Sequence, residues 1–336
     1  MPICFHKMEM ENLRRALGYV LLSTLLFSSM EIALKLAGAS FSALQLNFLR
    51  FLIGGIILSP LAISYLHQHQ LKVMAHLPLF LATGLICVVI SMTLYQLSVI
   101  AAPAATVAVV FSINPVFALL FSFLILHESL SRTSVISVIV SVIGLIVIIN
   151  PAHLSHPFGL ILALLSAVTF GLYSILSRWG SQRYGYNGIV MTAGTFLAGA
   201  VELLIVIGLS YLPIATKLIH GAATASFVKI PIVQGLSLGH LPLLAYIGIG
   251  VTGLGFAFYF LAMEHSDVST ASLVFFIKPG LAPIMAMLIL HEHIAATTVI
   301  GIIIILLGSV ISFINEAFME RVSEMLPFHH HNVIPH

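Results

Sequence analysis

Hydrophobic residues run along this chain in long stretches that are separated by short polar breaks. Ten stretches are long enough for a helix to cross a hydrocarbon core of about 30 Å. They lie at 17–36, 42–63, 77–99, 103–126, 133–150, 158–177, 188–209, 241–263, 268–290 and 296–315. Runs such as Ile300 to Leu307 do not alternate between apolar and polar residues, as transmembrane strands would. The pattern predicts an all-α membrane protein with ten transmembrane helices.

The stretches also repeat along the chain, at a separation of 164 residues. Residues 84–144 and 248–308, aligned without a gap, share 19 identities in 61 positions. The matched pairs include Tyr95 and Tyr259, Phe111 and Phe275, Pro115 and Pro279, His127-Glu128 and His291-Glu292, and Gly144 and Gly308. Each half holds five stretches, an odd number, so the second half enters the membrane from the opposite face. We therefore expect two inverted five-helix repeats around a central cavity, a plan that is typical of secondary transporters.

The repeat divides the chain into a first unit at 17–150 and a second at 158–315. The tails at 1–16 and 316–336 flank them, and an outer loop at 210–240 has no counterpart in the first half. This loop is either a plain connection or a partial lid over the outer mouth. The first stretch follows Arg14-Arg15 and has no small-residue cleavage site, so we expect a retained span instead of a removed signal peptide.

Composition and charge agree with a membrane location. Hydrophobic residues make up 60% of the 336 and charged residues 7%, which excludes an ordinary soluble domain. With the N-terminus inside, eight basic residues face the cytoplasm and two face outward, which predicts a multi-pass protein of the cell (cytoplasmic) membrane with both termini cytoplasmic. A net charge of +2, spread along the chain, gives no reason to expect a nucleic-acid partner.

Two matched prolines mark candidate substrate-binding positions. Pro115 and Pro279 fall near the middle of their stretches, and each deprives a carbonyl four residues earlier, at Phe111 or Phe275, of its donor. We expect both helices to bend or open there, because interrupted helices often line transport sites. The alternative is a kink without a role in binding.

The residues before the prolines are polar, namely Asn114 and Lys278. A lysine at mid-depth costs about 2.5–3.5 kcal/mol on insertion scales, so Lys278 should face a wet cavity or a carboxylate. We expect it to pair with an anionic group of the substrate or with Glu202; the alternative is an ion pair that is purely structural. Glu202 has no local partner and is a candidate for proton coupling.

Other charged and aromatic residues allow less specific hypotheses. Glu31 and Lys35 are one helical turn apart and are expected to neutralise each other. Arg50 either extends its charge toward the interface or lines the cavity. The remaining candidates for cavity walls are the aromatic residues Tyr95, Tyr259, Phe111, Phe275, Phe276 and Tyr173.

Catalytic and metal-binding patterns are weak. The two His-Glu pairs would need a second histidine three residues further on to form a zinc-protease motif, and Ser131 and Ala295 stand there instead. We expect no metal, no cofactor and no enzymatic activity. Glu128 and Glu292 lie at the ends of stretches, so we assign them a gate or helix-end role.

The run from Asn114 through Pro115 to His127-Glu128, followed by Gly144, resembles the signature segment of the EamA-type drug/metabolite transporter superfamily. Pro279 to His291-Glu292, with Gly308, repeats it, and 46–52 resembles the opening of that family's second span. The resemblance covers about 17–315 and implies ten helices, alternating access and usually export of small metabolites. The chain departs from the family in having histidine where glycine commonly precedes the glutamate.

These observations favour a secondary transporter, an exporter of a small metabolite such as an amino acid, a nucleoside, a sugar or a drug-like compound. Its expected partners are a small-molecule substrate and the lipid bilayer, with the protein a monomer or a homodimer. The alternatives are a flippase for a lipid-linked sugar and a membrane enzyme acting on lipid-linked substrates.

Overall fold

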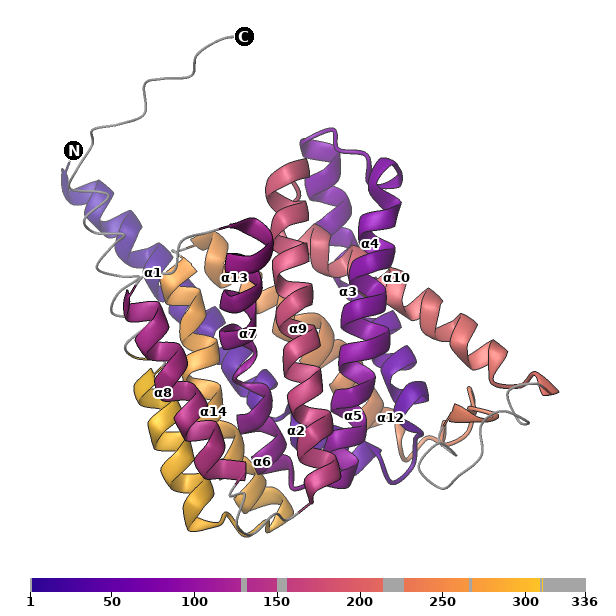
Figure 1. Ribbon diagram of the computed structural model, residues 1–336. Helices are drawn as coiled ribbons and strands as arrows, with labels where there is room; N and C mark the ends of the chain where they lie inside the picture. The colour runs from indigo at the N-terminus through magenta and orange to yellow at the C-terminus, as the bar shows by residue number, and fades with distance from the viewer. Residues whose placement is uncertain are drawn as a thin grey trace.

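The computed structural model describes residues 2–127, 132–149, 156–213, 227–265, 268–308 and 310, and this part of the chain consists of helices joined by turns and loops, without a strand (Figure 1). Eight of its helices are long and apolar enough to cross a membrane. They are Arg14–Ala37, Ala43–Gln68, Val73–Ala101, Ala104–Leu126, Pro157–Tyr184, Gly188–Leu209, Leu241–Met263 and Leu273–Leu290. Two further apolar helices, Val135–Ile149 and Ala296–Gly308, are shorter. Each of the ten predicted stretches thus contains a helix, and eight reach the length of a full span.

Most spans of the first half consist of more than one helical segment. The segments are α1 (Pro2–Ser28) and α2 (Met30–Ala37); α3 (Ala43–Gln68); η1 (Val73–His76), α4 (Leu77–Gly84), η2 (Leu85–Ser91) and α5 (Met92–Ala101); α6 (Ala104–Phe111), α7 (Asn114–Phe121) and η3 (Ser122–Leu126); and α8 (Arg132–Ile149). The first helix begins at Pro2, inside the segment that the sequence analysis treats as a tail.

The second half has fewer breaks. Its segments are α9 (Pro157–Tyr184), α10 (Gly188–Leu209), α12 (Leu241–Ala245), η5 (Tyr246–Leu254), α13 (Gly255–His265), α14 (Val268–Leu290) and the helix Ala296–Gly308. The segments η2 and η5 are π-helical and occupy matching places in the third and eighth stretches. Helices of the π type are rare in proteins, and those that occur are often found at functional sites. Both segments are therefore candidates for the walls of a binding site.

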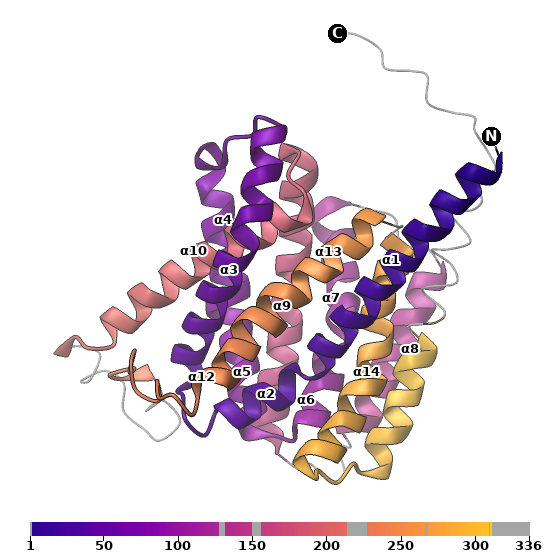
Figure 2. The ribbon, with the colours of Figure 1, turned by 180° about the vertical axis from the view of Figure 1, so that it is seen from behind.

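The two halves interlock instead of lying side by side as separate bundles. Helix α1 packs against α13 and α14, and α3 packs against α10 and η5, as Figures 1 and 2 show from opposite sides. A buried hydrogen bond from Ser23 Oγ to the Gly255 carbonyl oxygen, 2.9 Å long, joins α1 to α13. The centre of the molecule is therefore built from both halves.

Helix α8 and the helix Ala296–Gly308 form one edge of the molecule (Figure 1). A Cβ added at Gly144 would lie 2.9 Å from the Gly301 carbonyl oxygen, and one added at Gly308 would lie 3.1 Å from the Ser137 carbonyl oxygen. Gly144 corresponds to Gly308 in the repeat, and Ser137 corresponds to Gly301. The contact between Gly144 and Gly301 and the contact between Gly308 and Ser137 therefore join the same two repeat positions. A pair of helices related by a twofold axis makes each such contact twice.

The described part of the 210–240 loop, residues 210–213 and 227–240, packs against the start of α3. The buried Gln45 amide donates to the carbonyl oxygens of Ile232, at 2.9 Å, and Gln234, at 2.6 Å. These bonds fix the loop to the helix bundle. The central part of the loop lies outside the described residues.

Candidate functional site

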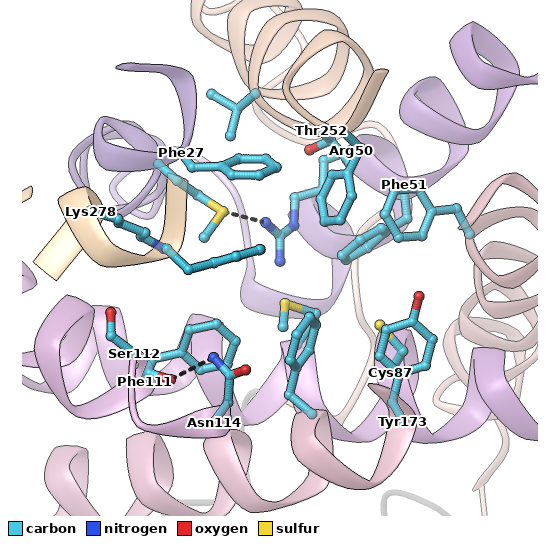
Figure 3. Close-up of a pocket in the computed structure, with 17 residues that line it drawn as sticks. Phe27, Arg50, Phe51, Cys87, Phe111, Ser112, Asn114, Tyr173, Thr252 and Lys278 are labelled. Carbon is cyan, nitrogen blue, oxygen red and sulfur yellow. Dashed lines mark hydrogen bonds between the residues drawn. The ribbon is translucent and has the colours of Figure 1, made fainter. Parts of the chain in front are cut away.

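A cavity lies where the two halves meet, and it encloses about 750 Å³ of empty space, counted out to its opening (Figure 3). Nine of its lining residues come from the first half: Phe27, Met30, Arg50, Phe51, Cys87, Met92, Phe111, Ser112 and Asn114. Eight come from the second half: Phe170, Tyr173, Phe196, Val251, Thr252, Phe256, Phe275 and Lys278. Both π-helical segments take part, through Cys87 of η2 and through Val251 and Thr252 of η5. The mostly apolar and aromatic walls are typical of a small-molecule site.

Lys278 reaches the cavity from α14, and its partner is Glu31 of α2. The Lys278 Nζ lies 2.9 Å from Glu31 Oε1, and the two side chains are 6% and 1% exposed. The Tyr95 hydroxyl of α5 donates a hydrogen bond to the same carboxylate oxygen. The ammonium also lies 5.7 Å from the centre of the Phe111 ring, within range of a cation–π contact. Three spans from the two halves therefore meet at one buried ion pair.

This pairing corrects two expectations from the sequence. Glu31 does not neutralise Lys35 one turn away, because the Lys35 Nζ lies 2.9 Å from Glu292 Oε1 instead. Lys278 pairs with Glu31 and not with Glu202. The local i, i+4 spacing was misleading, since each of the two α2 charges finds a closer partner in the second half of the chain.

The fourth stretch opens where Pro115 predicts it. Helix α6 ends at Phe111 and α7 begins at Asn114, and the Asn114 Nδ2 donates at 2.9 Å to the Phe111 carbonyl oxygen that the proline leaves without a backbone donor (Figure 3). In contrast, α14 continues as one helix through Pro279. Of the two expected outcomes at Pro279, a bend or an opening, the helix does not open, so Lys278 projects from a continuous helix.

Some of the aromatic residues predicted to form the cavity walls line the cavity, and others pack behind the lining. Phe111 and Phe275 line the cavity, whereas Tyr95 and Tyr259 pack behind them, with ring centroids 4.6 Å and 5.2 Å from the phenylalanine of the same half. Tyr173 also lines it. Pro115 and Pro279 lie next to lining residues without lining it themselves, and the Phe276 side chain lies outside the described part of the chain.

Arg50 is the residue whose role the sequence left open, and it lines the cavity. Its side chain, on α3, is 1% exposed and projects between Phe27 and Phe51 (Figure 3). The signal in the sequence was a charge within a predicted span, and it left two alternatives open. The spacing alone could not distinguish a buried arginine from one that reaches the membrane surface.

Glu202 lies on α10, away from the cavity lining. Its side chain is half-buried, and its Oε2 has no hydrogen-bond partner. Among the described candidate residues, those that line the cavity do not include Glu202.

Glu292 forms a contact at the end of α14 with Lys35 and the start of α6. We call this contact the outer latch, after the side of the membrane that the sequence predicts for it. Glu292 accepts hydrogen bonds from the backbone N–H groups of Ala104 at 2.9 Å and Ala105 at 3.0 Å, in addition to its ion pair with Lys35. Carboxylates are stabilised at helix N-termini by free N–H groups and by the helix dipole. The matched Glu128 lies outside the described residues.

The histidines before these glutamates occupy the same backbone conformation. His127 has φ of 56° and His291 has φ of 53°, both in the left-handed region that favours glycine. The departure from the family pattern noted in the sequence therefore places histidine where the backbone suits glycine.

A duplicated helical membrane protein with a cavity between its halves has the form of a small-molecule transporter. A family model, described as the EamA-like transporter family, matches residues 14–150 and again residues 157–314. The chain belongs to this family, within the drug/metabolite transporter superfamily.

Several relatives are named as transporters or exporters. An uncharacterized transporter of Clostridium kluyveri is 33% identical over 88% of this chain and 92% of its own. A probable terminal-alkyne amino-acid exporter of Streptantibioticus cattleyicolor is 22% identical over 84% and 87%, and an S-adenosylmethionine uptake transporter of Rickettsia conorii is 25% identical over 48% and 54%. A crystal structure 20% identical in sequence covers 91% of this chain and 98% of its own with a TM-score of 0.57, which supports the fold.

Proposed function

We propose that this protein is a secondary transporter that exports a small polar or amphipathic metabolite by alternating access, with the cavity between the halves as its substrate site. The observation that carries the proposal is the Lys278–Glu31 pair, which joins α14 to α2 at the edge of this cavity. Burying two charged side chains inside a membrane protein costs free energy, and charged residues at this depth commonly mark a functional site. The chain would lie in the cell membrane with both termini cytoplasmic.

The proposed architecture is ten helices in two inverted repeats. It is supported by the two family matches and by the reciprocal contacts of Gly144 with Gly301 and of Gly308 with Ser137. Two halves related in this way can exchange which side of a central site is closed.

The outer latch suits the role of a gate. Glu292 ties the end of α14, in the second half, to Lys35 and to the start of α6, in the first half. Opening toward the outside would break these three contacts together. We assign the corresponding inner role to Glu128, on the basis of its match in the repeat.

Export of an amino-acid-like compound is the proposed direction and substrate class. The support is the name of one relative with high coverage, the amino-acid exporter. The uptake transporter covers about half of this chain and therefore carries less weight.

The test is ligand binding by the purified protein, because a ligand that binds the folded state raises its thermal stability by mass action. Amino acids, nucleosides, sugars and organic cations form the panel. We expect one class to stabilise the wild type and to lose this effect in Lys278→Ala. Stabilisation that survives in Lys278→Ala would place the site elsewhere, and a folded wild type that responds to no member of the panel would favour a lipidic substrate.

Proton coupling through Glu202 remains a separate proposal, supported by its carboxylate oxygen without a partner. We expect Glu202→Gln in proteoliposomes to transport the substrate at a rate that no longer depends on an imposed pH gradient. The matched comparison is Glu31→Gln, which changes a carboxylate beside the cavity. Flux through Glu202→Gln that still follows the gradient would remove this role from Glu202.

A further inference from the structure

The cavity contains a buried cation, Arg50, that forms no ion pair with a carboxylate among the described residues. Within the described part of the chain, Arg50 has no acidic partner within 4.0 Å, whereas Lys278 is paired with Glu31. No acidic residue is among the lining residues. Among the described residues at the cavity, Arg50 and Lys278 are positive and Glu31 is negative, which leaves one excess positive charge.

The contacts of Arg50 fix its guanidinium without satisfying it. Its Nε donates at 3.0 Å to Asn47 Oδ1, and one terminal nitrogen lies 3.8 Å from the Met30 sulfur. The guanidinium carbon lies 4.4 Å from the centre of the Phe51 ring. The other terminal nitrogen, Nη2, is buried and has no hydrogen-bond partner. A buried charge with an unused donor is costly, and an anionic ligand would remove the cost.

The surroundings of this charge are aromatic. Eight of the seventeen lining residues are phenylalanine or tyrosine, and three of them, Phe27, Phe51 and Phe111, are labelled around Arg50 and Lys278 in Figure 3. Such walls accept an apolar body, while an arginine fork matches the geometry of a carboxylate.

We infer that the substrate is a small organic carboxylate whose negative charge is bound by Arg50 and whose apolar part lies among the phenylalanines. The inference rests on the proposed function and specifies the chemistry of the same cavity. The Lys278–Glu31 pair stays intact when this ligand binds, because Arg50 alone supplies the balancing charge.

The test uses three compounds that share one body and differ in charge: 3-phenylpropionate, 3-phenylpropionamide and 3-phenylpropylamine. Binding to the purified full-length protein is measured by titration and by thermal stability. We expect the carboxylate to bind at least about tenfold more tightly than the amide or the amine, as the loss of a charge-assisted hydrogen bond predicts. Equal binding of acid and amide by the wild type would overturn the inference, and so would a folded wild type that binds none of the three.

Two variants test Arg50 by different routes. Arg50→Gln removes the charge, and Asn47→Asp keeps the arginine but places a carboxylate where Asn47 accepts from Nε. Both should reduce the preference for acid over amide at least about tenfold. The second variant decides the question if the first does not fold. Lys72→Gln, which removes an exposed cation in the loop before η1, is the control and should keep the preference.

The outcomes separate this inference from the proposed function. If the amide or the amine binds and Lys278→Ala abolishes the binding, the cavity is a substrate site but not one for carboxylates. If the acid preference persists in both Arg50→Gln and Asn47→Asp, Arg50 is not the anion-binding residue.

Discussion

The Lys278–Glu31 pair shows how much one buried charge depends on its partner. Both side chains are almost fully buried, and the carboxylate also accepts a hydrogen bond from Tyr95. Removing one member of such a pair leaves an uncompensated charge in an apolar environment, whereas removing both leaves a smaller defect.

We therefore predict that Lys278→Met lowers the free energy of unfolding by about 3–5 kcal/mol, and that adding Glu31→Gln restores part of this loss. The comparison variant is Lys35→Met, whose ion pair with Glu292 is partly exposed and should contribute less than about 1 kcal/mol. Denaturant unfolding in detergent measures all three. A double variant as unstable as the sum of the two single variants would show that the charges do not interact.

At the scale of the elements, the break between α6 and α7 is held by close packing against α9. A Cβ added at Gly171 would lie 2.8 Å from the Ala118 backbone nitrogen and 3.1 Å from the Asn114 carbonyl oxygen. The contacting atoms are backbone atoms, so they cannot move without shifting α7. Glycine at this position thus allows α9 to approach the start of α7, where Asn114 lines the cavity.

We predict that Gly171→Ala destabilises the protein by about 1–3 kcal/mol, because α7 must move away from α9. Gly208→Ala on α10 is the matched control, since an added Cβ there meets no atom within 4 Å and alanine favours a helix. Thermal unfolding of both variants in the same detergent gives the comparison. Equal stabilities would mean that the contact at Gly171 relaxes without cost.

At the scale of the whole molecule, we expect the outer latch to set how easily the two halves separate on one side. It combines an ion pair with two backbone hydrogen bonds to the start of α6. A carboxylate at a helix N-terminus and a partly exposed ion pair together contribute about 1–2 kcal/mol.

We predict that Glu292→Ala raises the population that is open to the outside roughly fivefold to thirtyfold, the factor that corresponds to this energy. The readout is the rate at which a membrane-impermeant maleimide, added to intact cells, modifies Ser112→Cys in a background without Cys4 and Cys87. His293→Ala, which changes the exposed neighbour of Glu292, should leave the rate unchanged. A rate in Glu292→Ala no faster than in the parent would mean that the latch does not control access.

The sequence by itself determined the membrane character, the duplication and several positions at the cavity. The hydrophobic stretches predicted where helices occur because a bilayer core tolerates only helices or closed barrels. Pro115 predicted the break between α6 and α7, because a proline removes a backbone donor at a fixed distance along the chain. Asn114, Phe111, Phe275 and Lys278 were all singled out from the sequence, and all four line the cavity.

The tertiary structure alone decided how the charges are paired. Glu31 and Lys35 lie one turn apart, yet they bind Lys278 and Glu292, which are more than 240 residues away along the chain. Local spacing gives the distance between neighbours on one helix, but it contains no information about which helices face each other. The burial of Arg50 was decided by the tertiary structure for the same reason, because it depends on the packing of α3 against the second half of the chain. In the folded bundle, the charge of Arg50 reaches neither the membrane surface nor an acidic partner among the described residues.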